Sequence, residues 1–437
     1  MVSSRRWLTL AIACLASWTG AETAAAQGAV AYRGATLETL GKDGRIENAT
    51  IVVRDGKVEA VGSGIEIPTD ARIVPMDGRT ILPGLVDPYY VFTVREQPDI
   101  PDNIPEQFRN RFRGRGRTAV TTGPFVRVSE YFYPYDTEFD PAIRSGITSA
   151  NLVASGQGQS AFAWLRPEDG KGMIFEADGL LFLAVTNSSQ SLDILRNGLD
   201  PNQGGANRRG AFGGRGGRGG FAGRGGRGGG GRGDATPQRE GGEEQEEQPE
   251  ESSQTEKLWK SVRDGERPLI LNANNAAGVL HALRATAPYE KVRLAIVSTG
   301  SNLYELLDQL AGRHVTLILQ PGLERVPYTT ELMNVAAMAH EKEIPFVFSL
   351  SLNGNQLSRS QDDPFFPIAM LVKNDLPRDA ALRALTAGPA ALLGLEEKLG
   401  SLEKGKLANM LVFDGDPLET GSHLQEVIVE GSPVHEF

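Results

Sequence analysis

The sequence predicts an α/β protein whose middle part is either a parallel barrel or a doubly wound sheet. Apolar strand-like runs alternate there with helix-like stretches. The strand-like runs are residues 147–153, 179–185, 268–271, 294–297, 315–319 and 346–350, and the helix-like stretches include residues 302–311, 329–340 and 379–393. The chain has 437 residues, of which 40% are hydrophobic and 23% charged, so it can build a large core. This composition excludes a small stapled scaffold and a chain that is disordered throughout.

The two ends of the chain share a texture of short strands and turns that the middle lacks. Near the N-terminus, two alternating apolar runs, residues 49–53 and 58–62, flank Asp55-Gly56. Asp-Gly between such runs is the strongest short signal for a β-hairpin. Near the C-terminus, residues 409–413 and 426–430 are typical of strands. We therefore expect both ends to form the same kind of β-structure.

The N-terminal segment has the three parts of an export signal. Arg5 and Arg6 precede an apolar stretch, residues 7–18, and three alanines that end at Ala26 give a small-residue cleavage site. We expect cleavage near Ala26 and a periplasmic or secreted protein, exported by either the general or the twin-arginine route. The apolar stretch is shorter than the about 20 residues that a transmembrane helix needs, so no membrane span is predicted.

Cysteine and histidine are scarce. The only cysteine, Cys14, lies in the expected signal segment, which excludes disulfides, a cysteine nucleophile and thiolate zinc sites from the exported protein. Five histidines are few for a protein that binds transition metals, because imidazole is their usual ligand. We expect packing or surface roles for all of them: His281, His314, His340, His423 and His435.

Residues 201–256 form a low-complexity insertion that we expect to be disordered. Residues 208–232 are almost entirely glycine and arginine, and an acidic block, residues 240–256, follows. Such a stretch buries too little apolar surface to offset its ordering entropy. Arg-Gly-Gly tracts occur in RNA-binding tails, but a net charge of −10 and the expected export argue against a nucleic-acid partner. Arginines also alternate over residues 109–117, for which a solvated loop is a simpler explanation than an anion site.

Three stretches of the chain resemble the amidohydrolase superfamily. The first is residues 51–62 followed by Ile81-Leu82-Pro83-Gly84-Leu85-Val86-Asp87, and the last is residues 381–395 followed by residues 400–418. Between them, residues 142–148 followed by Ser155-Gly156-Gln157-Gly158 resemble the imidazolonepropionase-like branch of that superfamily. Apart from the signal segment and the insertion, the similarity covers the chain in the order and spacing of the family.

The resemblance implies a (β/α)8 TIM-type barrel that carries a small β-sandwich built from both chain ends. The expected organisation is a signal peptide (1–26), the N-terminal part of the sandwich (27–83), the barrel (84–399, with the insertion at 201–256) and the C-terminal part of the sandwich (400–437). It also implies hydrolysis of C–N bonds. In the family, one or two divalent ions, zinc or another metal, generate hydroxide from water.

The residues that hold these metals in the family are missing from this chain. The His-x-His pair of the family corresponds in this chain to Tyr89 and Val91. Its histidines of strands 5 and 6 fall near Asn272 and Thr299, and its aspartate of strand 8 falls within residues 351–353. Amide and hydroxyl oxygens are weak ligands for zinc or iron, so no metal and no other cofactor is predicted. Asp87 matches the family motif, in which it is mainly a structural residue, and it is the one catalytic candidate.

We expect the residues at these positions to line a polar pocket with few charges. The candidates are Tyr89, Tyr90, Asn272, Asn274, Thr299, Ser349, Ser351 and Asn353. Many donors and acceptors with few charges suit a neutral polar ligand such as a sugar or a peptide fragment.

Three functions are consistent with these residues. The first is an exported, non-catalytic binding or partner protein, a homo-oligomer or a complex with a metal-competent relative. The second is an active hydrolase of non-peptide or cyclic amide C–N bonds with an altered site. The third is RNA binding through the insertion, which predicts an affinity that falls steeply with salt. Metal content separates the first two.

Overall fold

The computed structural model describes residues 28–91, 95–96, 118–119, 125–132, 139–154, 156–165, 173–185, 189–201, 249–273, 275–298, 302–352 and 365–437. The expected signal peptide, residues 109–117 and most of the expected insertion lie outside these ranges. Three candidate site residues also lie outside them: Asn274, Thr299 and Asn353.

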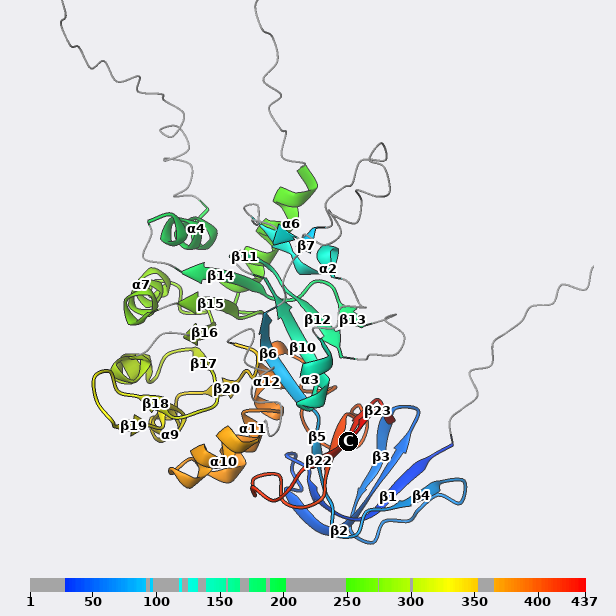
Figure 1. Ribbon diagram of the computed structural model, residues 1–437. Helices are drawn as coiled ribbons and strands as arrows, with labels where there is room; N and C mark the ends of the chain where they lie inside the picture. The colour runs from blue at the N-terminus through cyan, green and yellow to red at the C-terminus, as the bar shows by residue number, and fades with distance from the viewer. Residues whose placement is uncertain are drawn as a thin grey trace, which may run out of the picture.

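Both ends of the chain contribute strands to one eight-stranded sheet. Its strand order is β23-β22-β21-β5-β1-β2-β3, with β4 beside β1, and the two ends meet where β5 pairs antiparallel with β21. Figure 1 shows the blue N-terminal and red C-terminal strands in this common layer. The strands are β1 (Val30–Glu38), β2 (Arg45–Arg54), β3 (Lys57–Gly62), β4 (Arg72–Pro75), β5 (Thr80–Pro83), β21 (Met410–Phe413), β22 (Leu424–Val429) and β23 (Ser432–Glu436). The similar texture of the two ends thus reflects a shared sheet.

The hairpin expected at Asp55-Gly56 is confirmed. These two residues join β2 to β3, and both have left-handed backbone angles, with φ of 50° at Asp55 and 74° at Gly56. Two successive positive φ values define the turn whose twist matches that of the flanking strands, and Asp-Gly accepts them at low cost.

Two further sheets occupy the middle of the chain. One has the order β13-β12-β10-β6, in which β6 and β10 are parallel; its strands are β6 (Leu85–Val91), β10 (Ile147–Val153), β12 (Ala161–Trp164) and β13 (Ile174–Glu176). The other has the order β20-β17-β16-β15-β14-β11-β9, and its strands are β9 (Val126–Arg127), β11 (Gln157–Gln159), β14 (Leu181–Val185), β15 (Leu269–Ala273), β16 (Leu294–Ser298), β17 (Val315–Leu319) and β20 (Phe346–Phe348). From β14 to β20 all neighbouring pairs are parallel. Their near-continuous apolar runs are typical of strands that are buried on both faces.

Helices follow most of these strands and pack around them (Figure 1). They are α2 (Val128–Tyr131), α3 (Asp140–Arg144), α4 (Ser189–Leu199), α6 (Pro249–Arg263), α7 (Ala276–Thr286), the 3-10 turn Leu303–Leu306 with α8 (Leu307–Leu310), α9 (Val335–Glu341), α10 (Phe366–Lys373), α11 (Arg378–Arg383) and α12 (Ala387–Leu393). Two short antiparallel pairs, β7 (Arg95–Glu96) with β8 (Thr118–Ala119) and β18 (Glu324–Arg325) with β19 (Leu332–Met333), complete the described elements. No helix among the described residues is long and apolar enough to span a membrane.

Two expectations about helices need correction. The helix expected over residues 329–340 begins at Val335, because Leu332–Met333 pairs with β18 and Asn334 caps the helix by accepting from the Ala337 backbone N–H. The end of the segment expected to be disordered is helical, since α6 begins at Pro249. Trp259 of this helix is buried against Gly198 of α4, so its apolar face stabilises a helix that composition alone does not predict.

Candidate functional site

Asp87 is the centre of a buried hydrogen-bond network that joins β6 to the residues after β20. Its Oδ1 accepts from the Tyr89 backbone N–H at 2.9 Å and from Ser349 Oγ at 2.8 Å. Its Oδ2 accepts from the backbone N–H groups of Leu350 at 3.1 Å and Ser351 at 3.2 Å. The carboxyl group therefore connects β6 with the residues that follow β20.

These hydrogen bonds give Asp87 a structural role. Burial raises the pKa of the Asp87 carboxyl, and the hydrogen bonds from Tyr89, Ser349 and Ser351 act in the opposite direction. Backbone N–H groups can only donate, so three of the four donors require an acceptor and fit the carboxylate form. With both oxygens occupied in this way, Asp87 has little capacity left to move a proton in a reaction.

The two candidate serines belong to the same network. Ser349 and Ser351 are buried. Ser351 Oγ donates to the backbone carbonyl of Tyr89 at 3.0 Å, and Ser349 Oγ, whose hydrogen points to Asp87, lies 3.2 Å from the same carbonyl oxygen. A serine nucleophile needs a base within hydrogen-bond reach. Within the described ranges, no histidine hydrogen-bonds either serine. Both side chains therefore help to hold β6 against the residues that follow β20.

Tyr89 and Asn272 are brought together in the interior of the middle region. The Nδ2 of Asn272 donates to the Tyr89 hydroxyl at 3.0 Å. Tyr89 lies on β6 and Asn272 on β15, strands of different sheets, so their side chains meet across the space between the sheets. Burial raises the pKa of the Tyr89 hydroxyl, which keeps the phenol neutral at physiological pH.

This arrangement does not fit the metal centre that the resemblance implies. Tyr89 stands at a position of the family's His-x-His pair and Asn272 near that of its strand-5 histidine, and here the two hydrogen-bond each other. A neutral phenol and a carboxamide are poor ligands for zinc or iron. Within the part of the chain that the structure describes, no group of three or more His, Cys, Asp or Glu side chains could hold a metal ion.

Tyr90 lies on the other side of β6 from Tyr89. Its ring lies 5.8 Å, centroid to centroid, from that of Phe139, the residue that precedes α3. Tyr89 and Tyr90 are consecutive on a strand, so their side chains point to opposite faces, and only Tyr89 faces Asn272. The structure thus brings together Tyr89, Asn272, Ser349 and Ser351 around Asp87, and it places Tyr90 in the packing beneath α3.

The sequence analysis missed two polar residues of β10. Asn151 is fully buried, and its Nδ2 donates to the carbonyl of Pro88 at 2.9 Å. Its Oδ1, the Oγ of Ser149 and the Oδ1 of Asn272 are buried atoms that have no hydrogen-bond partner among the described residues. A buried polar atom without a partner costs about 1–3 kcal/mol. The sequence carries a signal for them, because Thr148, Ser149 and Asn151 are polar residues within the strand-like run 147–153.

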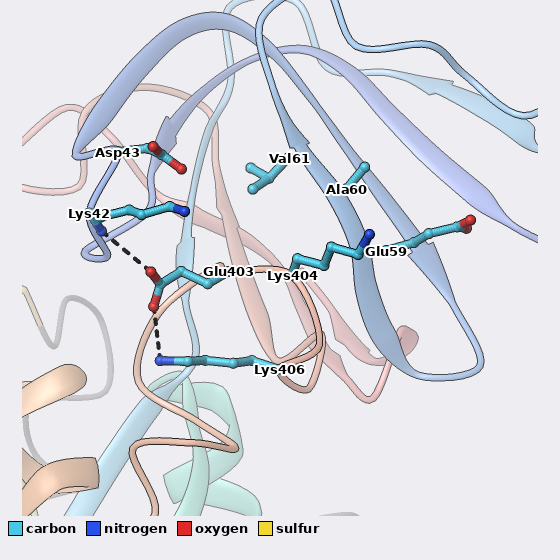
Figure 2. A pocket seen from close by; sticks show the side chains of 8 residues that line it. All are labelled: Lys42, Asp43, Glu59, Ala60, Val61, Glu403, Lys404 and Lys406. Atoms are coloured by element: carbon cyan, nitrogen blue, oxygen red, sulfur yellow. Dashed lines mark hydrogen bonds and ion pairs between the residues drawn. The ribbon is translucent and has the colours of Figure 1, made fainter.

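A hollow of about 440 Å³ lies elsewhere, on the eight-stranded sheet that both chain ends form, here called the end sheet. Figure 2 shows that charged side chains surround it, from the turn after β1, from β3 and from the loop before β21. Lys406 pairs with Glu403 at 3.0 Å, and Glu403 also accepts from Ser401 Oγ and from the Lys42 backbone N–H. These contacts occupy Glu403 within the fold. Glu403 and Lys406 thus stabilise the loop before β21.

Glu403 makes a pH-dependent contribution to stability that can be measured. The hydrogen bonds from Ser401 and Lys406 lower the pKa of Glu403 from 4.5 to about 2. Its contribution is therefore present above pH 4.5 and is lost as the pH falls toward 2. Because the side chain is 28% exposed, we discount it for solvent screening to about 1 kcal/mol. In urea unfolding, Glu403→Gln should lower the free energy of unfolding at pH 7. Between pH 5 and pH 3, the free energy of unfolding of the variant should fall less than that of wild type. Parallel curves of unfolding free energy against pH for the two proteins would contradict this.

Comparison with known proteins gives two consistent results. A family model described as "Amidohydrolase family" matches residues 368–435. The amidohydrolase from Thermotoga maritima MSB8 has the same fold, with a TM-score of 0.67 at 19% identity over 93% of this chain and 100% of that one. The family match at residues 368–435 and the shared fold agree with the resemblance of the motifs at both ends of the chain.

Two further comparisons agree with the shared fold and with the family match. The putative prolidase from Bifidobacterium longum superposes with a TM-score of 0.50 at 18% identity, over 94% of this chain and 95% of its own. "Amidohydrolase tasK" of Hapsidospora irregularis is 39% identical over 57 residues, which are 13% of this chain and 6% of that protein. The structural comparisons show the mixed α/β fold of these amidohydrolases.

Proposed function

We propose that this chain is an amidohydrolase-fold protein that binds a small polar ligand and does not catalyse metal-dependent hydrolysis. The observation that carries the proposal is the hydrogen bond between Tyr89 and Asn272. It joins two positions that the family uses for metal ligands, and it does so with two neutral groups. The same region keeps donors and acceptors that suit a neutral ligand.

The proposal includes the complete family architecture. We propose that the two middle sheets close into a (β/α)8 barrel, and that the end sheet forms the two halves of a β-sandwich. The four hydrogen bonds to Asp87 support closure, because they connect β6 of one sheet with the residues after β20 of the other. Register shifts within β1, where it pairs first with β4 and then with β5, support a bent sheet.

The second candidate function is hydrolysis of C–N bonds with an altered site. It is favoured by the names of proteins with the same fold, an amidohydrolase and a putative prolidase. This function requires an activated water and a group that moves a proton. Asp87 is the carboxylate of the described site, and its four hydrogen bonds leave it poorly suited to that role.

The test is turnover by the purified mature protein. Small amides, cyclic imides and proline dipeptides are incubated with it in the presence of zinc, manganese or iron. Tyr89→Phe is the matched variant, since it removes one hydroxyl from the site. We expect no product above the rate without protein for either form. Turnover by wild type that a chelator abolishes, or that Tyr89→Phe lowers by at least about tenfold, would establish the hydrolase instead.

A further inference from the structure

We propose that the outer edge of β3 and the charged hollow beside it bind an extended, acidic segment of a partner protein. This site belongs to the end sheet, whereas Tyr89 and Asn272 lie on strands of the two middle sheets, so the proposal goes beyond the proposed function and does not depend on it. Three observations carry it: an open strand edge, a hollow alongside that edge, and two unpaired lysines in the lining of the hollow.

The outer edge of β3 is covered over only part of its length. β3 is the last strand in the order of the end sheet. The loop before β21 covers its beginning: the Val58 N–H donates to the Lys406 carbonyl at 2.9 Å, and the Val58 carbonyl accepts from the Gly405 N–H at 2.8 Å. Over residues 59–62, the described residues pair with β3 only from the side of β2. This part of the edge can therefore accept a further strand.

The hollow of about 440 Å³ lies alongside the open part of the edge. Ala60 and Val61 both line it, although they pack against different apolar clusters. Successive side chains of a strand point to opposite faces, so a hollow that touches both residues lies beside the strand rather than on one face. Ala60, Val61 and Gly62 provide neither the charge nor the proline that often protects an exposed edge. An extended segment thus finds both space and backbone partners there.

The acidic side chains around the hollow are mostly paired within the fold. Glu59 pairs with Arg54 at 2.8 Å, and Glu403 pairs with Lys406 at 3.0 Å. Asp43 is the one carboxylate of the lining that forms no ion pair with a described residue.

Two lysines of the lining are also unpaired. Among the described residues, no carboxylate forms an ion pair with Lys42 or Lys404. In Figure 2, Lys42 extends from the turn after β1 toward the hollow, and Lys404 extends from the loop before β21 toward Glu59. Two unpaired ammonium groups and one unpaired carboxylate leave a net positive charge, which favours carboxylates on the partner. A strand projects side chains on both sides of its backbone, so one segment can pair with β3 and present carboxylates to the lysines.

The test measures the binding of a fluorescein-labelled hexapeptide of alternating valine and glutamate to the full chain by fluorescence anisotropy. We expect this peptide to bind at least about tenfold more tightly than the same peptide with lysine in place of glutamate. Methylation of every second backbone nitrogen should weaken binding about tenfold in only one of the two registers, because alternate N–H groups face the neighbouring strand. Equal affinity of the acidic and basic peptides, or no effect of methylation in either register, would overturn the proposal.

The double variant Lys42→Glu, Lys404→Glu tests the role of the lysines. It should bind the acidic peptide at least about tenfold more weakly than wild type. Its control is Lys257→Glu, Lys373→Glu, which changes the net charge equally at exposed residues of α6 and α10 and should bind as wild type does. Circular dichroism checks that both variants are folded. Equal affinity of the two double variants would refute the site, whereas metal content and turnover decide the proposed function separately.

Discussion

Replacing Asp87 by asparagine is expected to lower the free energy of unfolding by about 3 kcal/mol. The carboxylate accepts four hydrogen bonds, three of them from backbone N–H groups. In the variant, an amide NH2 group replaces one carboxylate oxygen. This NH2 group is a donor, and it faces backbone N–H groups that can only donate. Buried groups left without partners then weaken the connection between β6 and the residues after β20.

Urea unfolding of Asp87→Asn and of Asp43→Asn measures this effect. Asp43 is exposed on the turn after β1, so its variant should stay within about 0.5 kcal/mol of wild type. An Asp87→Asn variant as stable as wild type would refute the structural role of Asp87. If wild type had measurable turnover and this stable variant lost it, Asp87 would instead act in catalysis.

Restoring three histidines is expected to create a zinc site. The variant Tyr89→His, Val91→His, Asn272→His places imidazoles at both positions of the family's His-x-His pair and at the residue that contacts Tyr89. Three imidazoles are sufficient to hold zinc with an open coordination position. We expect zinc affinity at least about 1,000-fold higher than that of wild type, measured by competition with a chromogenic chelator.

A matched control moves one histidine to the other face of β6. In Tyr90→His, Val91→His, Asn272→His, the first imidazole lies beside Phe139 instead of opposite Asn272. It should bind zinc about as weakly as wild type, and circular dichroism checks that both variants are folded. Equal affinity of the two triple variants would mean that Tyr89 and Asn272 do not occupy the positions of metal ligands.

The sequence predicts those parts of the fold that depend on local patterns. Asp55-Gly56 selects its turn through backbone preference alone, and the apolar runs of β14 to β17 follow from burial on both faces. The start of α9 was misplaced because Asn334, a capping residue, lay inside the run that was assigned to the helix. The helical end of the insertion was missed because Trp259 owes its burial to Gly198, a contact with another helix.

Only part of the site could be predicted. The family motif located Tyr89 and Asp87, and similarity of the strands suggested Asn272. Alternation along a strand would have separated Tyr89 from Tyr90, since neighbours face opposite sides. The partners of Asp87 are mostly backbone N–H groups, which leave no trace in residue identity. The position of Asn151 beside Pro88 depends on an irregular register between β10 and β6, which no single segment encodes.

The most direct test of the central claim is the metal content of the wild-type protein. The protein is purified without chelator, incubated with zinc, manganese or iron, desalted and analysed by inductively coupled plasma mass spectrometry beside the restored-histidine variant. Because Tyr89 and Asn272 hydrogen-bond each other and are poor metal ligands, we expect wild type to retain only traces of metal while the variant retains zinc. Near-stoichiometric metal in wild type would contradict the claim and return the protein to the metal-dependent hydrolases.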